Sequence, residues 1–202
     1  MLQRLSMTFV QFFLSEGIIK EDDQDVYLYG MEMLLSQVLI YGCSILIALI
    51  WKCVIAAIAY YGGFLLLRHS AGGYHARTHK GCALLTMMTY LAAMLITIYL
   101  PQEWRQASVI VMAVIALGSI YGFAPVDHVN KPFSQEEKKR YRYQSLLVVN
   151  VISFVCLLFM FGANEMEWTM AAMLGVFNAS ISVVIGSEVR KRNVEKVNDL
   201  LC

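Results

Sequence analysis

Six long apolar stretches constrain the fold of this chain more than any other feature of its sequence. They cover residues 31–50, 53–67, 82–100, 107–124, 146–162 and 169–187. A helix that crosses a bilayer needs about 20 mostly apolar residues, and it satisfies its backbone hydrogen bonds internally. Hydrophobic residues make up 58% of the chain and charged residues only 15%, which departs from globular usage. The sequence therefore predicts an all-α integral membrane protein with six transmembrane helices.

The basic residues between these stretches predict the orientation of the chain. Lys and Arg accumulate near the cytoplasmic ends of membrane helices. With six spans and both termini on one side, that side holds all of the 16 basic residues except Lys52 and Arg105. We therefore expect cytoplasmic N and C termini, and a single membrane domain over residues 1–202. Its cytoplasmic parts are the loops 68–81 and 125–145 and the tail 188–202.

The first 20 residues have the pattern of an amphipathic helix. The apolar residues that fall on one helical face are Leu2, Leu5, Phe9, Phe12 and Phe13. This arrangement favours a helix that lies in the membrane interface ahead of the six-helix bundle at 31–187. A seventh buried helix is the alternative.

The loop sequence "RHSAGGYHARTHKGC" holds the residues best suited to chemistry. A thiol attacks a carbonyl as the thiolate, which a helix N-terminus, a nearby cation or a histidine base favours. Cys82 is expected in the first turn of a helix, with His75 as its base. Seven residues of unbroken helix would separate the two by about 10 Å. The pair therefore needs backbone bends, which Gly72, Gly73 and Gly81 permit.

Two other readings of this loop stay open. His75, His79 and Cys82 could form a zinc site with one open position, although their spacing matches no common zinc pattern. The loop could also be a basic anchor with incidental histidines, His69 among them. No disulfide framework is evident in the five cysteines.

The loop sequence also resembles the signature of the AgrB family, the membrane endopeptidases of Gram-positive quorum sensing. Two further segments, "YGFAPVDHVNKPFSQEEKKRYR" and "YGMEMLLSQV", resemble other parts of that family. The resemblance implies a cofactor-free cysteine endopeptidase in the bacterial cell membrane, with its active site at the cytoplasmic face. It would remove the acidic tail of an AgrD-type precursor through a thioester on Cys82, with His75 as general base. The product would close to a thiolactone or lactone, and the enzyme would be a homodimer.

Several charged residues are candidates for supporting roles. Arg68 would bind a substrate carboxylate or stabilise an oxyanion, or serve only as a positive-inside charge. Glu32 would support His75 or simply cap a helix, and Asp127 is a second carboxylate that could orient His75. The basic residues expected to attract an acidic substrate tail, or else anionic lipid, are Lys138, Lys139 and Arg140, with Arg142 close by.

The spans carry their own signals. Asn150 and Asn178 lie within predicted spans, where we expect hydrogen bonds between helices, and Gly62 and Gly63 would allow close helix approach. The spans are nearly free of charge, which counts against a transporter or channel. A net charge of +1, with basic residues explained by topology, gives no support to nucleic-acid binding. A noncatalytic membrane scaffold or metal sensor remains an alternative.

Overall fold

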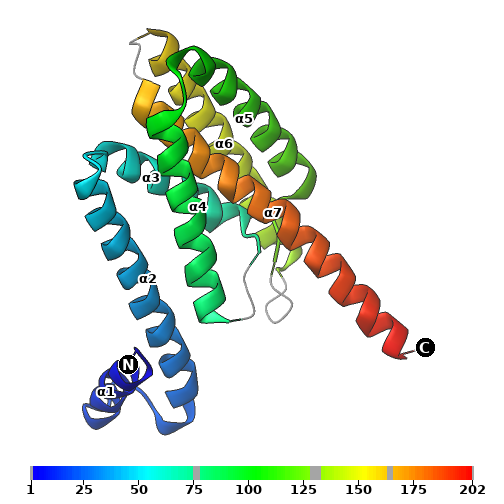
Figure 1. The fold of residues 1–202 in the computed structure, drawn as a ribbon. Coiled ribbons are helices and arrows are strands. Elements are labelled where there is room, and N and C mark those ends of the chain that lie inside the picture. The colour runs from blue at the N-terminus through cyan, green and yellow to red at the C-terminus, as the bar shows by residue number, and fades with distance from the viewer. Residues whose placement is uncertain (1, 75–77, 128–132, 163–165, 202) are drawn as a thin grey trace.

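The computed structural model of the chain is a bundle of helices (Figure 1). It describes residues 2–74, 78–127, 133–162 and 166–201, with the helix backbone alone at 2, 79–80, 166 and 193–201. The helices are α1 (Leu2–Ser15), a short 3-10 turn η1 (Glu21–Asp23), α2 (Gln24–Ile50), α3 (Val54–Ala71), α4 (His79–Tyr99), α5 (Gln102–Phe123), α6 (Gln135–Gly162) and α7 (Met166–Leu201).

Helices α2 to α7 are each long and apolar enough to cross a bilayer, so the prediction of six membrane spans is confirmed for the described chain. The second apolar stretch looked short in the sequence, but α3 reaches 18 residues because it extends through Arg68 to Ala71. Helix α7 continues unbroken from the last predicted span into the predicted tail. The chain is therefore a multi-pass membrane protein by the length and composition of its helices.

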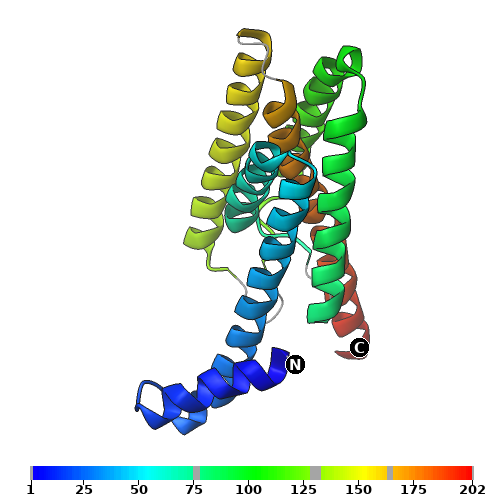
Figure 2. The same cartoon turned by 60° about the vertical axis from the view of Figure 1, so that its left-hand side comes forward.

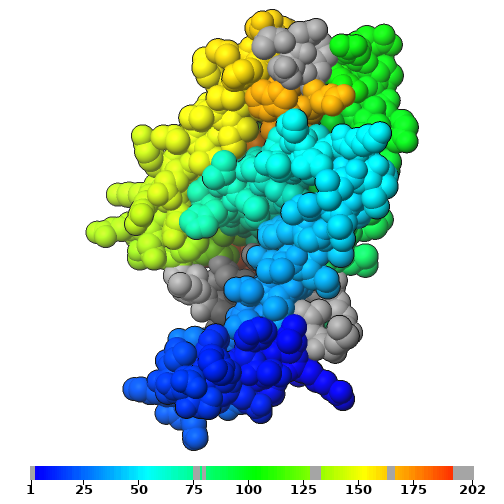
Figure 3. All heavy atoms as spheres, turned by 90° about the vertical axis from the view of Figure 1, so that its left-hand side faces the viewer, coloured from blue at the N-terminus to red at the C-terminus, as the bar shows by residue number. Residues whose placement is uncertain are grey.

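Helix α1 lies apart from the bundle, and its main packing in the described chain is against α2. Ser6 and Val10 are buried where α1 meets α2, whereas Leu5, Phe9 and Phe12 are exposed. Figure 3 shows α1 and the beginning of α2 projecting beyond the rest of the molecule. An exposed apolar face suits a helix in the membrane interface and argues against a seventh buried helix.

Helices α3 and α7 pack more closely than the other helix pairs of the bundle. A Cβ atom on Gly175 would come within 2.1 Å of the Tyr60 carbonyl oxygen, and one on Gly63 within 2.4 Å of the Ala172 carbonyl oxygen. Gly62, by contrast, faces open space. The expected close helix approach thus occurs at Gly63 alone of the predicted glycine pair, and it lies within one chain.

Polar side chains add specific links between the spans. Asn178 of α7 donates a hydrogen bond of 3.0 Å to the Tyr60 hydroxyl of α3, as expected for an amide within a span. The same expectation is wrong for Asn150, which donates to the Leu146 carbonyl of its own helix and is exposed. A bond to the preceding turn satisfies one amide hydrogen without any partner helix.

Helix α2 is held to the bundle mainly through its second half. The Ser44 hydroxyl lies 2.7 Å from the Tyr61 hydroxyl, and the Ser44 carbonyl accepts a hydrogen bond of 2.9 Å from the Tyr90 hydroxyl. Figure 2 shows α2 running along the side of the bundle, with α1 and the end of α7 at the same end of the molecule. The turn after α3 and the start of α4 also lie toward that end (Figure 1).

Candidate active site

Cys82 lies in the first turn of α4, which begins at His79. Thr78 caps this helix: its hydroxyl accepts the Gly81 N–H at 3.1 Å, and its carbonyl accepts the Cys82 N–H at 3.0 Å. The Cys82 thiol is free and partly exposed. Because the helix starts only at His79, no continuous helix carries Cys82 back to Tyr74, which was the arrangement that would have excluded a Cys/His pair. The N-terminal turn of a helix favours negative charge, as a thiolate requires.

His75 lies outside the described residues, but the chain that leads to it is firmly placed. The Tyr74 N–H donates to the Ser182 carbonyl at 2.8 Å and lies 3.1 Å from the Ser182 hydroxyl. The Arg68 guanidinium donates to the Tyr74 carbonyl, to the Ser182 hydroxyl and, at 3.1 Å, to the Gly72 carbonyl. Arg68 therefore ties the end of α3, the turn after it and α7 together. We call this group, Arg68, Gly72, Tyr74 and Ser182, the turn clamp.

The glycine pair of the loop is required by this geometry. Gly72 has φ of 72° and Gly73 has φ of 127°, a backbone region that side chains with a Cβ rarely adopt. A Cβ on Gly72 would also come within 2.1 Å of the Val126 carbonyl oxygen, and one on Gly186 within 2.7 Å of the Tyr74 nitrogen. The expected bend thus occurs at Gly72 and Gly73, whereas Gly81 lies inside α4.

The connection between α5 and α6 is fastened to the same place. The Val126 N–H donates to the Ala71 carbonyl at 3.0 Å, and Val126 forms an isolated parallel bridge with Gly72. The buried Asp127 carboxylate pairs with Arg190 of α7 at 2.8 Å and accepts the Phe133 N–H at 3.1 Å. Asp127 therefore holds its loop against α7 in this structure.

A cavity of about 170 Å³ opens beside Cys82, between α2, α3, α4 and α7. Arg68, Tyr74 and Cys82 line its end near the loops, and Ser182 lines the wall on α7. The residues that line its inner part lie one or two helical turns further into the bundle: Tyr41, Phe64, Thr86, Thr89 and Asn178. The thiol thus has a cation and a mostly apolar hollow beside it.

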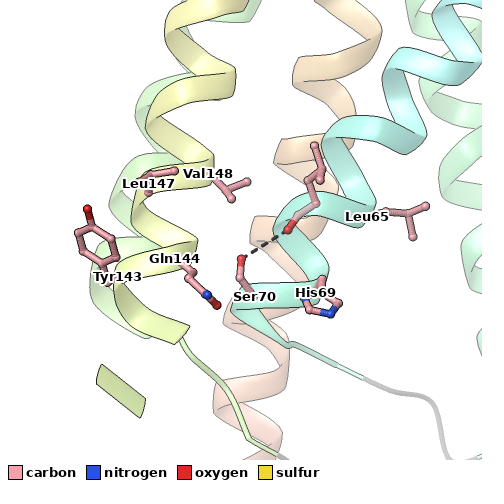
Figure 4. A pocket seen from close by; sticks show the side chains of 8 residues that line it. Leu65, His69, Ser70, Tyr143, Gln144, Leu147 and Val148 are labelled. Atoms are coloured by element: carbon pink, nitrogen blue, oxygen red, sulfur yellow. Dashed lines mark hydrogen bonds between the residues drawn. The ribbon is translucent and has the colours of Figure 1, made fainter. Parts of the chain in front are cut away.

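His69 and Glu32 are not among the residues that line this cavity. His69 lines a separate hollow of about 510 Å³ between α3 and α6, opposite Gln144 and Tyr143 (Figure 4). There Ser70 donates a hydrogen bond back to the Leu66 carbonyl of its own helix. Glu32 is in the third turn of α2, so it is too far from the N-terminus at Gln24 to act as a helix cap.

The basic cluster lies in the first turns of α6. Ser134 and Glu137 cap this helix reciprocally, with bonds of 2.9 Å and 3.2 Å between backbone N–H groups and side-chain oxygens. Arg142 donates to the Tyr121 carbonyl at 3.0 Å and lies over the Tyr121 ring, so it joins α6 to α5. Lys139 and Arg140 are exposed and Lys138 is half-exposed. None of the three lines the Cys82 cavity.

The described residues contain no group of three or more His, Cys, Asp or Glu side chains that could hold a metal ion. His75 and the His79 side chain lie outside that set. Of the residues in the zinc reading, the structure thus places only the Cys82 side chain.

Sequence reasoning missed the part that α7 plays in the site. Asn178, Ser182 and Gly186 are spaced four residues apart, so they share one face of the helix. Asn178 bonds Tyr60, Ser182 holds Tyr74, and Gly186 gives room for the turn after α3. A stripe of polar and small residues at this spacing in an otherwise apolar span is the signal that predicts a packed, functional face.

Comparison with known proteins agrees with the resemblance seen in the sequence. The family model of accessory gene regulator B, AgrB, matches residues 6–184. A putative AgrB-like protein of Listeria monocytogenes serotype 4a is 24% identical over an alignment of 183 residues that covers 87% of each chain. A putative AgrB-like protein of Clostridium perfringens strain SM101 is 21% identical over 192 residues, covering 92% of this chain and 87% of the relative. No solved structure matches. Since the family model spans most of its length, the chain belongs to the AgrB family.

Proposed function

We propose that this protein is a membrane cysteine endopeptidase that processes a peptide precursor of the AgrD type for quorum sensing. The observation that carries the proposal is the position of Cys82, a free thiol in the first turn of α4 beside a cavity that it shares with Arg68. Membership of the AgrB family supports the same activity. The helix N-terminus and the cation favour the thiolate form of Cys82, and the cavity offers space for part of a peptide substrate.

In the proposed reaction the Cys82 thiolate attacks the scissile carbonyl, and the bond to the acidic tail breaks. His75, protonated on taking the thiol proton, gives that proton to the departing amine, so the acyl group remains on sulfur as a thioester. A thiol or hydroxyl of the bound peptide then gives its proton to His75 and attacks the thioester, and the bond between the Cys82 sulfur and the acyl carbon breaks. A thiolactone or lactone leaves, and Cys82 is regenerated. A site at the bilayer interface helps to exclude water from the second step.

The support that the chain offers this chemistry comes from the turn clamp. The Tyr74 backbone is bonded at its N–H to Ser182 and at its carbonyl to Arg68, and His75 is the next residue. A fixed backbone at Tyr74 helps to position His75 against the Cys82 sulfur, because misplacement by about 1 Å can cost about 100-fold in rate. Arg68 therefore acts on catalysis as a positioning residue, through the turn it holds.

The remaining features of the proposal concern the environment. The loops and the basic start of α6 belong in the cytoplasm of a bacterial cell, where Lys138, Lys139 and Arg140 would attract an acidic tail. Glu32 stays the candidate for a carboxylate that orients His75, whereas Asp127 is already paired with Arg190. A homodimer in the cell membrane is part of the proposal on the ground of family resemblance alone.

Intact-mass spectrometry of the full chain in lipid tests this function. The protein is incubated with a candidate precursor, and native protein is compared with Cys82→Ala, His75→Ala and the matched control Cys43→Ala. We expect native protein and the control to gain the mass of the precursor without its tail, and the Cys82 variant to gain nothing. Cleavage that survives Cys82→Ala but stops with a chelator would establish the metal alternative instead. Absence of cleavage by every form would leave a noncatalytic scaffold.

A further inference from the structure

We propose that the cavity beside Cys82 is the binding site for the side chain of the peptide residue whose carbonyl is attacked, and that it selects an apolar side chain. This inference rests on the proposed function and extends it to the substrate. It concerns the hollow between α2, α3, α4 and α7 and the residues at its inner end.

The position of the cavity decides what can occupy it. Cys82 lines it, so an acyl carbon bonded to the Cys82 sulfur carries its own side chain directly to the opening. From there the hollow runs along α4 past Thr86 to Thr89, a distance of about 10 Å for seven residues of helix. It follows α3 from Arg68 back to Phe64. An extended side chain pointing from the acyl carbon into the bundle fills this space.

The size of the cavity limits its occupant to part of a peptide. Its volume of about 170 Å³ is below the roughly 300–1,000 Å³ of pockets that enclose drug-sized ligands. One large side chain fits such a space, whereas a folded segment of peptide does not. The rest of the substrate must therefore lie outside, toward the loops and the basic start of α6.

The walls of the cavity select an apolar side chain. Met33, Ile40, Phe64 and Leu65 supply apolar side chains to its walls from α2 and α3. The Thr89 hydroxyl is already bonded to the Leu85 carbonyl of its own helix, and the Asn178 amide donates to Tyr60. A charged side chain would lose its water here, and the described residues at the inner end offer it no full charge, which costs several kcal/mol in a membrane interior. Arg68, the cation of the cavity, is held at the outer end by the turn clamp.

Peptidyl chloromethyl ketones test the site without relying on cleavage of a precursor. In this reaction the thiolate displaces chloride from the chloromethyl carbon, so a carbon–sulfur bond forms as the carbon–chlorine bond breaks. Three acetylated dipeptide probes that differ only in the residue next to the ketone, Leu, Ala or Asp, are reacted with the full chain in nanodiscs. Peptide mass spectrometry follows the labelling of Cys82. Each rate is divided by the rate of iodoacetamide on the same variant, so that differences in thiol access cancel.

We expect the Leu probe to label Cys82 about tenfold or more faster than the Ala and Asp probes, since small apolar differences in a fitted pocket give factors of about 10 to 200. Thr89→Leu, which fills the inner end, should bring the Leu and Ala rates within about threefold of each other. Leu84→Phe also enlarges a side chain of the same helix, but on an exposed face, and should keep the preference. Phe64→Leu removes an aromatic ring from the wall and so enlarges the cavity. It should speed labelling by a probe with Trp next to the ketone.

Equal normalised rates for the Leu and Ala probes on native protein would overturn the proposal. Retention of the full preference in Thr89→Leu would overturn the assignment to this cavity, with a lipid chain as the alternative occupant. If the probe preference holds but no precursor is cleaved, the side-chain site stands and the proposed function fails. If a precursor is cleaved with no probe preference, the function stands and the side-chain site fails.

Discussion

Helices α2 and α7 are both apolar spans, but the bundle buries them to very different extents. In the part of the chain that the structure describes, 67% of the 18-residue membrane window of α7 is buried and only 11% of that of α2. Helix α7 meets its neighbours with small residues such as Ala171, Ala172 and Gly175. Helix α2 instead turns large aliphatic residues such as Val38 and Leu46 outward. Lipid solvates leucine and valine well, so burial in a membrane follows side-chain size and polar contacts more than apolarity.

This difference divides the candidate site into a fixed part and a looser part. The turn clamp and the Asp127–Arg190 pair attach both loops to α7. The opposite wall of the Cys82 cavity is α2, which Ser44 ties to Tyr61 and Tyr90 at the other end of the span. Catalysis requires a fixed nucleophile and base, and substrate entry requires a wall that gives way. In the proposed function, α7 supplies the fixed part and α2 the wall that yields.

The largest effect is expected where α7 crosses α3. Gly175→Ala places a Cβ within 2.1 Å of the Tyr60 carbonyl oxygen, so the two helices must separate, at a cost of about 3 kcal/mol or more. The yield of folded protein in detergent and its thermal midpoint measure this loss. Gly42→Ala in α2 is the matched control, because nothing lies within 4 Å of its new methyl group. Equal behaviour of the two variants would remove the distinction between the helices.

The next effect concerns the ion pair that fastens the second loop to α7. Asp127→Asn leaves Arg190 without its partner, and since the Arg190 side chain is 38% exposed we expect a loss of only about 1–3 kcal/mol. Thermal unfolding in detergent measures this loss. Adding Arg190→Gln to the Asp127→Asn variant should lower the thermal midpoint little further. The exposed pair of Glu188 and Lys191 on the same helix supplies the control, Glu188→Gln, which should leave the midpoint unchanged.

The turn clamp should affect processing more than stability. Ser182→Ala removes the hydroxyl that accepts from Arg68 and lies within hydrogen-bonding distance of the Tyr74 N–H, so we expect precursor cleavage to slow about tenfold. Single-turnover acylation of Cys82 at saturating precursor measures the step directly. Ser180→Ala is the control, because among the described residues that hydroxyl donates to the Val176 carbonyl of its own helix and contacts no part of the clamp. An acylation rate in Ser182→Ala equal to that of native protein would contradict the role of the turn clamp.

The smallest effect is expected in α2. Ser44→Ala removes the contact with the Tyr61 hydroxyl, worth about 0.6 kcal/mol by comparison with other membrane helices. Hydrogen exchange should rise along α2 and stay unchanged along α7. Ser153→Ala in α6 should alter neither helix, because the Ser153 hydroxyl has no hydrogen-bond partner among the described groups. Faster exchange in α7 would show that the two helices are coupled.

Much of the fold follows from the sequence, because the bilayer imposes its own constraints. An apolar segment of the right length must become a helix whose backbone bonds are internal, and this determined the six spans. The spacing of Leu5, Phe9 and Phe12 likewise determined a helix with an exposed apolar face. The start of α4 near Cys82 was predictable as well, since a polar stretch ends there and an apolar one begins.

The tertiary structure decided how each helix is rotated and which loop residues meet. Hydropathy does not determine rotation in a membrane, because lipid accepts almost every apolar face. For that reason the neighbours Arg68 and His69 point to different hollows, and Asn150 bonds its own helix while Asn178 bonds another. Ser182 lies 114 residues after Arg68 in the chain, and no local sequence pattern predicts the hydrogen bond between them. The sequence alone thus predicts the spans and the candidate nucleophile, and only the packing of α7 against the loops builds a site around them.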